Sequence, residues 1–411
     1  MNRGTMMEYT FSKPETDEDY EALYQVMDAV FGDEDVRGIT RRFVEHHPGM
    51  NKEHFFVVKH GDKAVAGLVL VPQEWKLGEA ELKVAEMGCV GTDPEHRRKG
   101  VQWILNNEFD KYVKENGFDL CVLAGIPYFY RQFGYQYAVE LDYSTELKVE
   151  DLPNMDTGIK VERFEETHID VADEILTKTQ ERYLVRSVRT KGIWGMQQTT
   201  GTYGGEPYEA DVFTRGGGIA GYYRYVVDDE KKTINIKELG ISENVSAKEI
   251  AAVIRKLASE KGLAELKTGL SHMDEFSKYL LSRGAKTNRP YAWQVKIIDL
   301  SGFLSKIIPV LEQRIENSEY TGLSKDITIN FWKYAVKMKI EEGKIASIEK
   351  AFGEKDRTIG FNPYVFTKLA LGYKSRMELE KMYPDFRVQG DLGGLIDVMF
   401  PKQPSYIHYS Y

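Results

Sequence analysis

The stretch Val-Gly-Thr-Asp-Pro-Glu-His-Arg-Arg-Lys-Gly-Val, residues 90–101, is the most informative part of the sequence. It lies between an extended apolar run, Leu82–Val90, and a segment, Val101–Glu115, whose apolar residues recur at helical spacing. The first N–H groups of a helix have no partner within the helix, and the helix dipole adds partial positive charge there. With the basic run Arg97–Lys99 and the small residue Gly100, this junction predicts a cradle for a pyrophosphate. The alternative is a solvated basic turn that merely begins a helix, because short basic strings with glycine are common.

The elements around this stretch predict a mixed α/β segment, and the next part of the chain repeats their order. The first segment begins with a helix, Asp17–Phe31, and a hairpin whose strands are Phe55–Lys59 and Ala64–Val71 around a turn at residues 60–62. A strand, Leu82–Val90, leads to the basic loop at residues 91–100. A helix, Val101–Glu115, and a strand, Asp119–Leu123, follow. The second has Glu209–Thr214 and Ile219–Val227 as a hairpin, then Thr233–Gly240, Ala247–Lys261 and Leu266–Leu270. Its turn at Ile241–Ser246 has no basic run, so we expect only the first segment to hold a polyanion.

A third segment of different composition begins near Asp299. It predicts a helix at Leu300–Glu316, strands within Gly322–Lys350, helices at Tyr364–Leu371 and Arg376–Met382, and an aromatic tail, Phe400–Tyr411. A chain of 411 residues exceeds a single core, since cores stop growing near ~250–300 residues. We therefore expect three domains, residues 1–150, 151–298 and 299–411.

Composition excludes several classes of protein. The 55 basic and 64 acidic side chains give a net charge of −9, which argues against nucleic acid, because phosphate binding needs a basic face. Two cysteines cannot build a disulfide framework, and no Cys or His cluster has zinc-ligand spacing, so we expect a cytoplasmic protein without a metal. No apolar run approaches the ~20 residues of a membrane helix, and the N-terminus does not read as a signal peptide.

Two motifs carry a resemblance to a known family. Residues 90–101 resemble the coenzyme A loop of GNAT-type acyltransferases, whose pattern is Arg/Gln-x-x-Gly-x-Gly/Ala after a strand. Arg97–Val101 fits its first five positions, and Gln102 departs from the sixth. Phe-Tyr-Arg-Gln-Phe-Gly-Tyr at residues 129–135 resembles a stretch of the Eis-like (enhanced intracellular survival) N-acetyltransferases. Members of that family end in an aromatic residue whose α-carboxylate enters the active site, and this chain ends in Tyr411.

The resemblance implies a fold, a cosubstrate and an assembly. The implied fold is α+β, with two tandem GNAT (mixed-sheet acyltransferase) domains, the second lacking the coenzyme loop, and then a sterol carrier protein-like α/β domain. Acetyl-CoA is the implied cosubstrate, and a homo-oligomer, a hexamer in the family, is implied as well. The expected coenzyme contacts are Val90, Gly91, Thr92, Arg97, Arg98, Lys99, Gly100, Val101, Gln102, Trp103, Gly125 and Ile126.

The resemblance also implies the catalytic roles. An amine must be neutral to attack a thioester, so a base must accept its proton. The family assigns that role to the terminal carboxylate, here Tyr411, and the acid role to the tyrosine that matches Tyr130. A free α-carboxyl has a pKa of roughly 3.3–3.7, so it is a weak base unless it is desolvated. Without the motif, Tyr130 would be an ordinary core aromatic among 25 tyrosines.

The expected acceptors are cationic amines, namely aminoglycosides, other polyamines or lysine-containing peptides. Asp28 lies in an acidic stretch, and the matching region of GNAT folds borders the acceptor pocket, where carboxylates would attract a polycation. The alternative for Asp28 is the solvated end of a helix.

Two other functions remain open from the sequence. A lipid or small-molecule carrier, or a regulatory coenzyme-binding protein, predicts a large apolar cavity within residues 299–411. A longer-chain acyl or aminoacyl transferase would use the same tandem units with another donor. The acetyltransferase predicts that Tyr411 lies near Tyr130.

Overall fold

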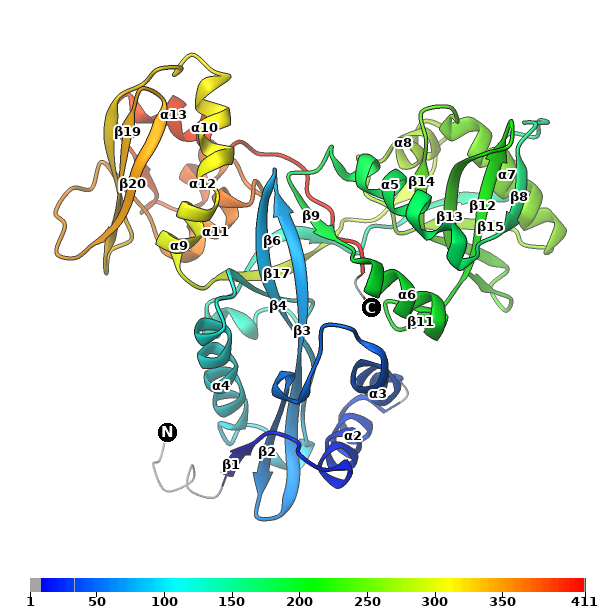
Figure 1. The fold of residues 1–411 in the computed structure, drawn as a ribbon, viewed down its shortest axis with the longest axis horizontal. Coiled ribbons are helices and arrows are strands. Elements are labelled where there is room, and N and C mark those ends of the chain that lie inside the picture. The colour runs from blue at the N-terminus through cyan, green and yellow to red at the C-terminus, as the bar shows by residue number, and fades with distance from the viewer. Residues whose placement is uncertain (1–8, 33, 410) are drawn as a thin grey trace. The chain divides into compact units, whose positions relative to one another are not determined.

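The computed structural model describes residues 9–32, 34–409 and 411. The chain divides into two compact units (Figure 1). The first comprises Met1–Val139 and Trp293–Gln403, and the second comprises Glu140–Ala292 and Pro404–Tyr411. Each unit is built on a mixed β-sheet with helices, so the predicted α+β class is confirmed.

The first unit contains a sheet of strand order β1-β2-β3-β4-β5-β17-β6. Its strands are β1 (Tyr9–Ser12), β2 (Phe55–His60), β3 (Lys63–Leu77), β4 (Ala80–Thr92), β5 (Leu120–Leu123), β17 (Tyr291–Ile297) and β6 (Gln136–Leu141). β1 to β4 pair antiparallel in turn, and β4 pairs parallel with β5. The helix α4 (Val101–Glu115) covers one face, and α2 (Asp17–Phe31) and α3 (Val36–His46) cover the other (Figure 1).

The core of this sheet follows from the periodicity of the flanking helices. Leu105, Phe109 and Val113 of α4 are fully buried against the side chains of β2 and β3. On the opposite face α2 packs so closely that a β-carbon on Gly67 would lie 2.3 Å from Cδ1 of Leu23. Thr16 caps α2 by a reciprocal capping box with Asp19, which explains why the predicted and observed starts agree.

The second unit repeats the same topology. Its sheet has the order β16-β7-β15-β14-β13-β12-β8, and β14 pairs parallel with β15 as β4 does with β5. The strands are β7 (Thr145–Lys148), β8 (Lys160–Arg163), β12 (Glu209–Arg215), β13 (Gly218–Asp228), β14 (Thr233–Ile241), β15 (Glu265–Thr268) and β16 (Lys286–Thr287). The helices α7 (Ala247–Glu260) and α8 (Glu275–Ser282) share a core on one face. α5 (Ile169–Gln180) and α6 (Lys191–Thr200) share a core on the other.

Two strands and the C-terminal tail join a different sheet or unit from the one that their position in the sequence predicts. β17 pairs with β5 in the first sheet, although it falls within the predicted second domain, residues 151–298. β7 pairs with β15 in the second sheet, although it falls within the predicted first domain, residues 1–150. The end of the chain, which we expected to close the third domain, groups with the second unit. The reason is main-chain pairing, because the N–H of Leu184 donates to Pro404 and that of Tyr406 donates to Val185.

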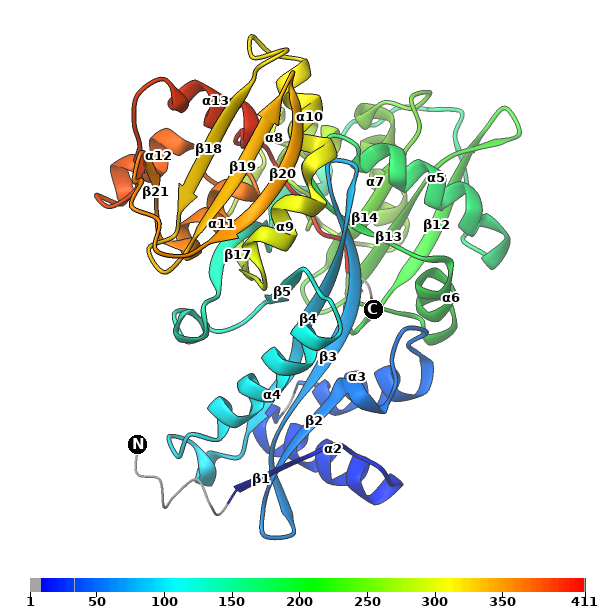
Figure 2. The same cartoon turned by 60° about the vertical axis from the view of Figure 1, so that its left-hand side comes forward.

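The rest of the first unit is a separate sheet with its own helices. β18 (Lys325–Asn330), β19 (Ala335–Glu341) and β20 (Lys344–Ala351) lie side by side, and Figure 2 shows them with α11 (Pro363–Ala370), α12 (Arg376–Met382) and α13 (Leu392–Met399). The single helix predicted at 300–316 is two helices, α9 (Leu300–Lys306) and α10 (Ile308–Glu316). Pro309 lies in the first turn of α10, where its missing N–H is tolerated, so a new helix begins there. The likeness of this part to sterol carrier proteins stays a prediction.

Candidate functional site

A β-bulge opens the sheet of the first unit at the end of β4. The pairing of β3 with β4 shifts register between Gly67 and Val69, and Cys89 takes a left-handed φ of 47°. The parallel pairing of β4 with β5 ends at Glu86 and Val122. From Met87 onward β4 therefore lacks β5 as a ladder partner, which leaves main-chain groups of the strand open to a ligand.

The basic loop after β4 forms a concave turn into α4. Asp93 first caps a short 3-10 helix, Pro94–His96, by accepting from the N–H of Glu95. Arg98 and Gly100 then take left-handed φ values of 63° and 86°. Gly100 is the N-cap of α4 and gives no side-chain cap, so the first N–H groups of that helix are left for another acceptor. Successive N–H groups in such a turn, with the helix dipole, favour an anion.

A cavity of about 680 Å³ lies against this loop. Ten residues predicted as site residues line it: Val90, Thr92, Arg97, Arg98, Gly100, Val101, Gln102, Trp103, Ile126 and Tyr130. Six further lining residues were not predicted: Val30, Phe31, His96, Phe129, Gln132 and Phe133. Gly91, Lys99 and Gly125 are not among the lining residues. The structure thus brings most of the expected coenzyme contacts and Tyr130 to one cavity.

Tyr130 lies at the start of a 3-10 helix, Tyr130–Phe133, that Gly134 ends with a φ of 94°. Its ring is 7% exposed, and burial raises the pKa of its hydroxyl to about 12. The phenol is therefore neutral at physiological pH and is able to donate a proton. Beneath it, a β-carbon on Gly125 would lie 2.6 Å from Cε2 of the ring, so Gly125 contributes by leaving room rather than by touching the cavity.

An aromatic wall completes the cavity, and sequence reasoning missed most of it. The rings of Trp103 and Phe133 lie edge to face with centroids 4.6 Å apart, and Phe129 packs edge to face on Tyr130. Phe129 and Phe133 fall inside the motif at residues 129–135, so their spacing around Tyr130 was the available signal. His96 is buried, its Nδ1 lies 3.0 Å from the hydroxyl of Tyr9, and burial lowers the pKa of the imidazole.

Asp28 does not line this cavity. It lies on α2, where its carboxylate accepts from Arg37 at 2.6 Å, and its side chain is 52% exposed. The same guanidinium pairs with Glu21 at 2.8 Å. Its surroundings are those of a solvated helix surface.

The C-terminal residue lies in the second unit. The N–H of Gly204 donates to an oxygen of Tyr411 at 2.6 Å, and the rings of Tyr409 and Tyr411 pack at 6.2 Å between centroids. The terminal carboxylate is therefore held by a main-chain donor of that unit. Because Tyr130 belongs to the first unit, the approach of this carboxylate to Tyr130 stays a prediction.

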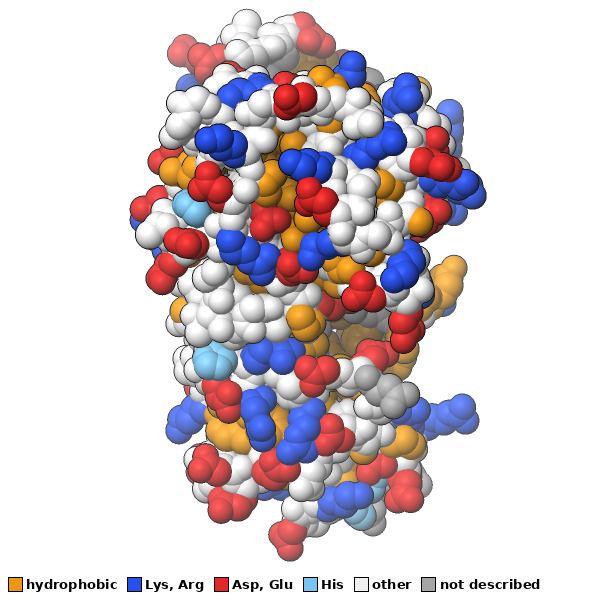
Figure 3. Space-filling model, turned by 90° about the vertical axis from the view of Figure 1, so that its right-hand side faces the viewer, with side chains coloured by type: hydrophobic (Ala, Val, Ile, Leu, Met, Phe, Trp, Pro, Cys, Tyr) orange, Lys and Arg blue, Asp and Glu red, His pale blue; other side chains and the backbone are white. Residues whose placement is uncertain are grey.

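Among the residues with a described placement, no group of three or more His, Cys, Asp and Glu side chains is arranged to hold a metal ion. No helix among the same residues has the length and apolarity to cross a membrane. Figure 3 shows one face of the molecule, on which basic and acidic side chains are interspersed.

The segment that forms most of the first sheet is similar in sequence to a known protein family. Residues 12–138 match the family described as acetyltransferase (GNAT) domain. A search of curated proteins finds no significant match.

Solved structures match the chain over nearly its whole length. A GCN5-related N-acetyltransferase from Anabaena variabilis is 14% identical with a TM-score of 0.74, over 98% of this chain and 100% of that one. A probable N-acyltransferase from Enterococcus faecalis is 17% identical with a TM-score of 0.76, over 98% and 100%. Eis1 from Mycobacterium abscessus is 15% identical with a TM-score of 0.65, over 96% and 98%. Residues 12–138 thus match a GNAT acetyltransferase domain by sequence, and the fold of nearly the whole chain is similar to that of Eis1.

Proposed function

We propose that this GNAT-type acetyltransferase transfers the acetyl group of acetyl-CoA to an amine of a cationic acceptor. The observation that carries the proposal is the cavity near the point where the pairing of β4 with β5 ends. Residues of the basic loop and the buried phenol of Tyr130 both line it. Its lining combines donors for a diphosphate with an apolar wall for a pantetheine arm. A GNAT domain implies acetyl-CoA as cosubstrate.

The loop would hold the diphosphate through main-chain and side-chain donors. The left-handed turn at Arg98 and Gly100 aims N–H groups into a concavity, and the guanidinium groups of Arg97 and Arg98 add charge. The side chain of Gln102, which departs from the family pattern, lines the same cavity, and its Nε2 is buried with no hydrogen-bond partner. An oxygen-rich ligand would satisfy that donor.

The transfer itself needs a base, an oxyanion site and an acid. The amine loses its proton to the carboxylate of Tyr411, directly or through water, and its nitrogen attacks the thioester carbonyl. Main-chain N–H groups near Val90 stabilise the tetrahedral oxyanion. The carbon–sulfur bond then breaks, and Tyr130 donates its hydroxyl proton to the departing sulfur. The nitrogen of the tetrahedral intermediate gives up its second proton to solvent, and the carboxyl of Tyr411 releases the first one there. Solvent returns a proton to Tyr130, and the products are the N-acetyl amine and the free thiol.

The acceptor class follows from charge. The chain carries a net charge of −9 even though its coenzyme loop is basic, so its overall field favours cationic acceptors. Aminoglycosides, other polyamines and lysine-containing peptides share a primary amine with further positive charge nearby. The family resemblance supports a homo-oligomer of six chains, which light scattering would test. The scarcity of cysteine supports a cytoplasmic location, which fractionation would test.

The decisive experiment is a screen for thiol release from acetyl-CoA with each acceptor class. Wild-type enzyme should release thiol only with an amine acceptor, and a variant lacking Tyr411 should lose most of this rate. Full turnover without Tyr411 would refute the assigned base. Propionyl-, longer acyl- and aminoacyl donors run in parallel test the other transferase. The large apolar cavity within residues 299–411 that a carrier would need stays a prediction.

A further inference from the structure

A buried charge cluster lies inside the second unit, outside the cavity of the first. Glu238 of β14 is fully buried, and both terminal nitrogens of Arg189 donate hydrogen bonds to its carboxylate, at 2.8 and 2.5 Å. Tyr222 donates to the same carboxylate at 2.9 Å. Nε of Arg224, a residue 1% exposed, lies 3.7 Å from it. Such a cluster is costly to desolvate and is weak evidence for stability alone, so its role needs another explanation.

The charges of this cluster are fixed at neutral pH. Burial opposes ionisation of Glu238, but the two guanidinium groups outweigh it and hold the pKa of the carboxyl well below its usual range. Arg224 gains further support from the rings of Trp194 and Tyr208, at 4.5 and 4.9 Å from their centroids. The cluster is therefore a permanently charged set of two guanidinium donors around one carboxylate acceptor, and it does not titrate at neutral pH.

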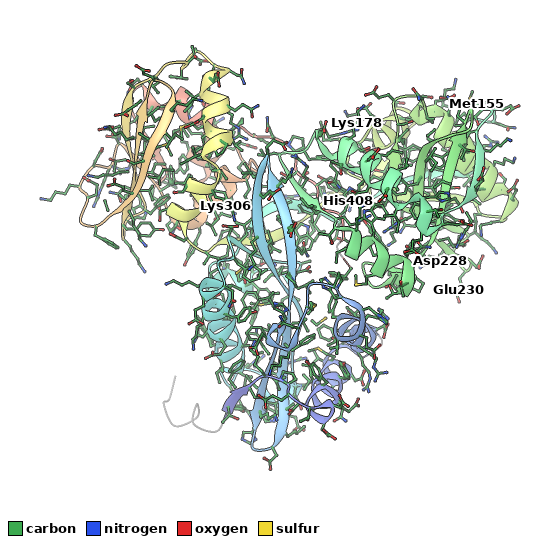
Figure 4. The ribbon with its side chains drawn as sticks, in the orientation of Figure 1. Met155, Lys178, Asp228, Glu230, Lys306 and His408 are labelled. Carbon is green, nitrogen blue, oxygen red and sulfur yellow. The ribbon has the colours of Figure 1, made fainter. Side chains whose placement is uncertain are left out.

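Glu238 and Arg189 of this cluster form hydrogen bonds with the end of the chain. Nδ1 of His408 lies 3.2 Å from the carboxylate of Glu238, and burial lowers the pKa of that imidazole, so the neutral tautomer with a proton on Nδ1 donates to Glu238. The carbonyl of Tyr409 accepts from Arg189 at 3.4 Å and from Gln197 at 3.2 Å. Oε1 of Gln197 accepts in turn from Arg224 at 2.5 Å. His408 is labelled in Figure 4.

Main-chain pairing alone does not fix the register of this tail. The N–H of Leu184 donates to the carbonyl of Pro404, and the N–H of Tyr406 donates to the carbonyl of Val185. Extended segments repeat such bonds every second residue, so a slip by two residues would keep many of them. A slip that brings Tyr406 opposite Glu238 would put a larger ring in the place of the His408 imidazole, and it would break the bond from the Tyr406 hydroxyl to the carbonyl of Gly269 at 3.0 Å.

We propose that Glu238 is a positioning residue, which acts through Arg189 and His408 to fix the register of Pro404–Tyr411 and hence the place of the terminal carboxylate. The catalytic half of this inference rests on the proposed function, in which that carboxylate is the base. A buried ionic group that specifies register is the best attested use of such groups. It also accounts for two guanidinium groups buried around a single carboxylate.

The test compares two changes of similar size at His408. His408→Leu removes the donor to Glu238, whereas His408→Gln keeps one. Carboxypeptidase A, which releases C-terminal aromatic residues, should free tyrosine about tenfold faster from His408→Leu and at nearly the wild-type rate from His408→Gln. Release at the wild-type rate from His408→Leu would overturn the inference. Lys178→Gln is the control, since Lys178 belongs to an exposed ion pair of the same unit, 2.7 Å from Glu243 (Figure 4).

Turnover separates the positioning role from a purely structural one. His408→Leu should lower kcat for amine acetylation by roughly 10- to 100-fold, because small displacements of a reacting group cost that much, and should leave KM for acetyl-CoA unchanged. His408→Gln should restore kcat. If deletion of Tyr411 lowers kcat and His408→Leu does not, the positioning role is wrong. If the deletion keeps kcat, the assigned base is wrong, and carboxypeptidase release still decides whether the cluster fixes the tail.

Discussion

The ring of Tyr130 rests on Gly125, with so little space between them that a β-carbon on Gly125 would lie 2.6 Å from the ring carbon Cε2. The same β-carbon would lie 2.6 Å from Cδ1 of Leu123, so the space is closed on both sides. Gly125 therefore sets the position of the phenol that faces the cavity.

Gly125→Ala should displace the Tyr130 ring and lower kcat by roughly tenfold or more, because misplacing a proton donor weakens its action in the transition state. KM for acetyl-CoA should change less. Gly195→Ala is the matched control, since a β-carbon there meets nothing within 4 Å. Normal kcat in Gly125→Ala would show that the phenol has room to move or has no part in catalysis.

Tyr130→Phe keeps the packed ring and removes the hydroxyl. With the phenol as acid, kcat should fall by roughly 100-fold while KM for acetyl-CoA stays the same. Because burial raises the pKa of Tyr130 to about 12, the wild-type rate should show no loss from this group between pH 7 and pH 10. Stopped assays of thiol release across that range check both statements, and a wild-type rate in the variant refutes the acid role.

Arg98 offers a way to separate side chain from main chain in the coenzyme loop. Its φ of 63° strains most side chains but suits glycine, so Arg98→Gly removes the guanidinium and preserves the turn. We expect KM for acetyl-CoA to rise about fivefold, which corresponds to about 1 kcal/mol. Arg98→Lys should retain part of the affinity. An unchanged KM in Arg98→Gly would mean that main-chain donors alone hold the diphosphate.

The sequence predicted the first sheet and its loop well because its signals there are local. The helical spacing of apolar residues placed α2 and α4 at their observed bounds. The helix α3 was missed, since Gly38 and two adjacent arginines obscure its apolar stripe.

The parts that sequence reasoning did not predict depend on contacts between distant residues. Nothing local in β7 or β17 tells that each joins a sheet across a long connection. The anchoring of the tail was likewise hidden, because Glu238 and His408 are 170 positions apart and neither stands in a motif. The aromatic lining at Phe129 and Phe133 was within reach, since the motif around Tyr130 contains both.

The stability of the first unit should fall in mild acid because of two buried histidines. Burial lowers the pKa of His47 and of His54 to about 4, and each accepts a main-chain N–H on Nδ1 in its neutral form. An unfolded histidine has a pKa near ~6.5, so between pH 6.5 and pH 4 the unfolded chain binds more protons and is favoured as pH falls. At pH 5 the loss relative to pH 7 should be about 2 kcal/mol per histidine.

Replacing both residues by asparagine isolates this contribution, because asparagine supplies an acceptor near the position of Nδ1 and does not titrate. Urea unfolding of wild type should show a lower midpoint at pH 5 than at pH 7, and His47→Asn with His54→Asn should lose much of that difference. His46→Asn is the control, since the side chain of His46 is 41% exposed. If the double variant keeps the full wild-type dependence, other groups cause the acid sensitivity, and the two imidazoles are protonated in the folded protein as readily as in the unfolded chain.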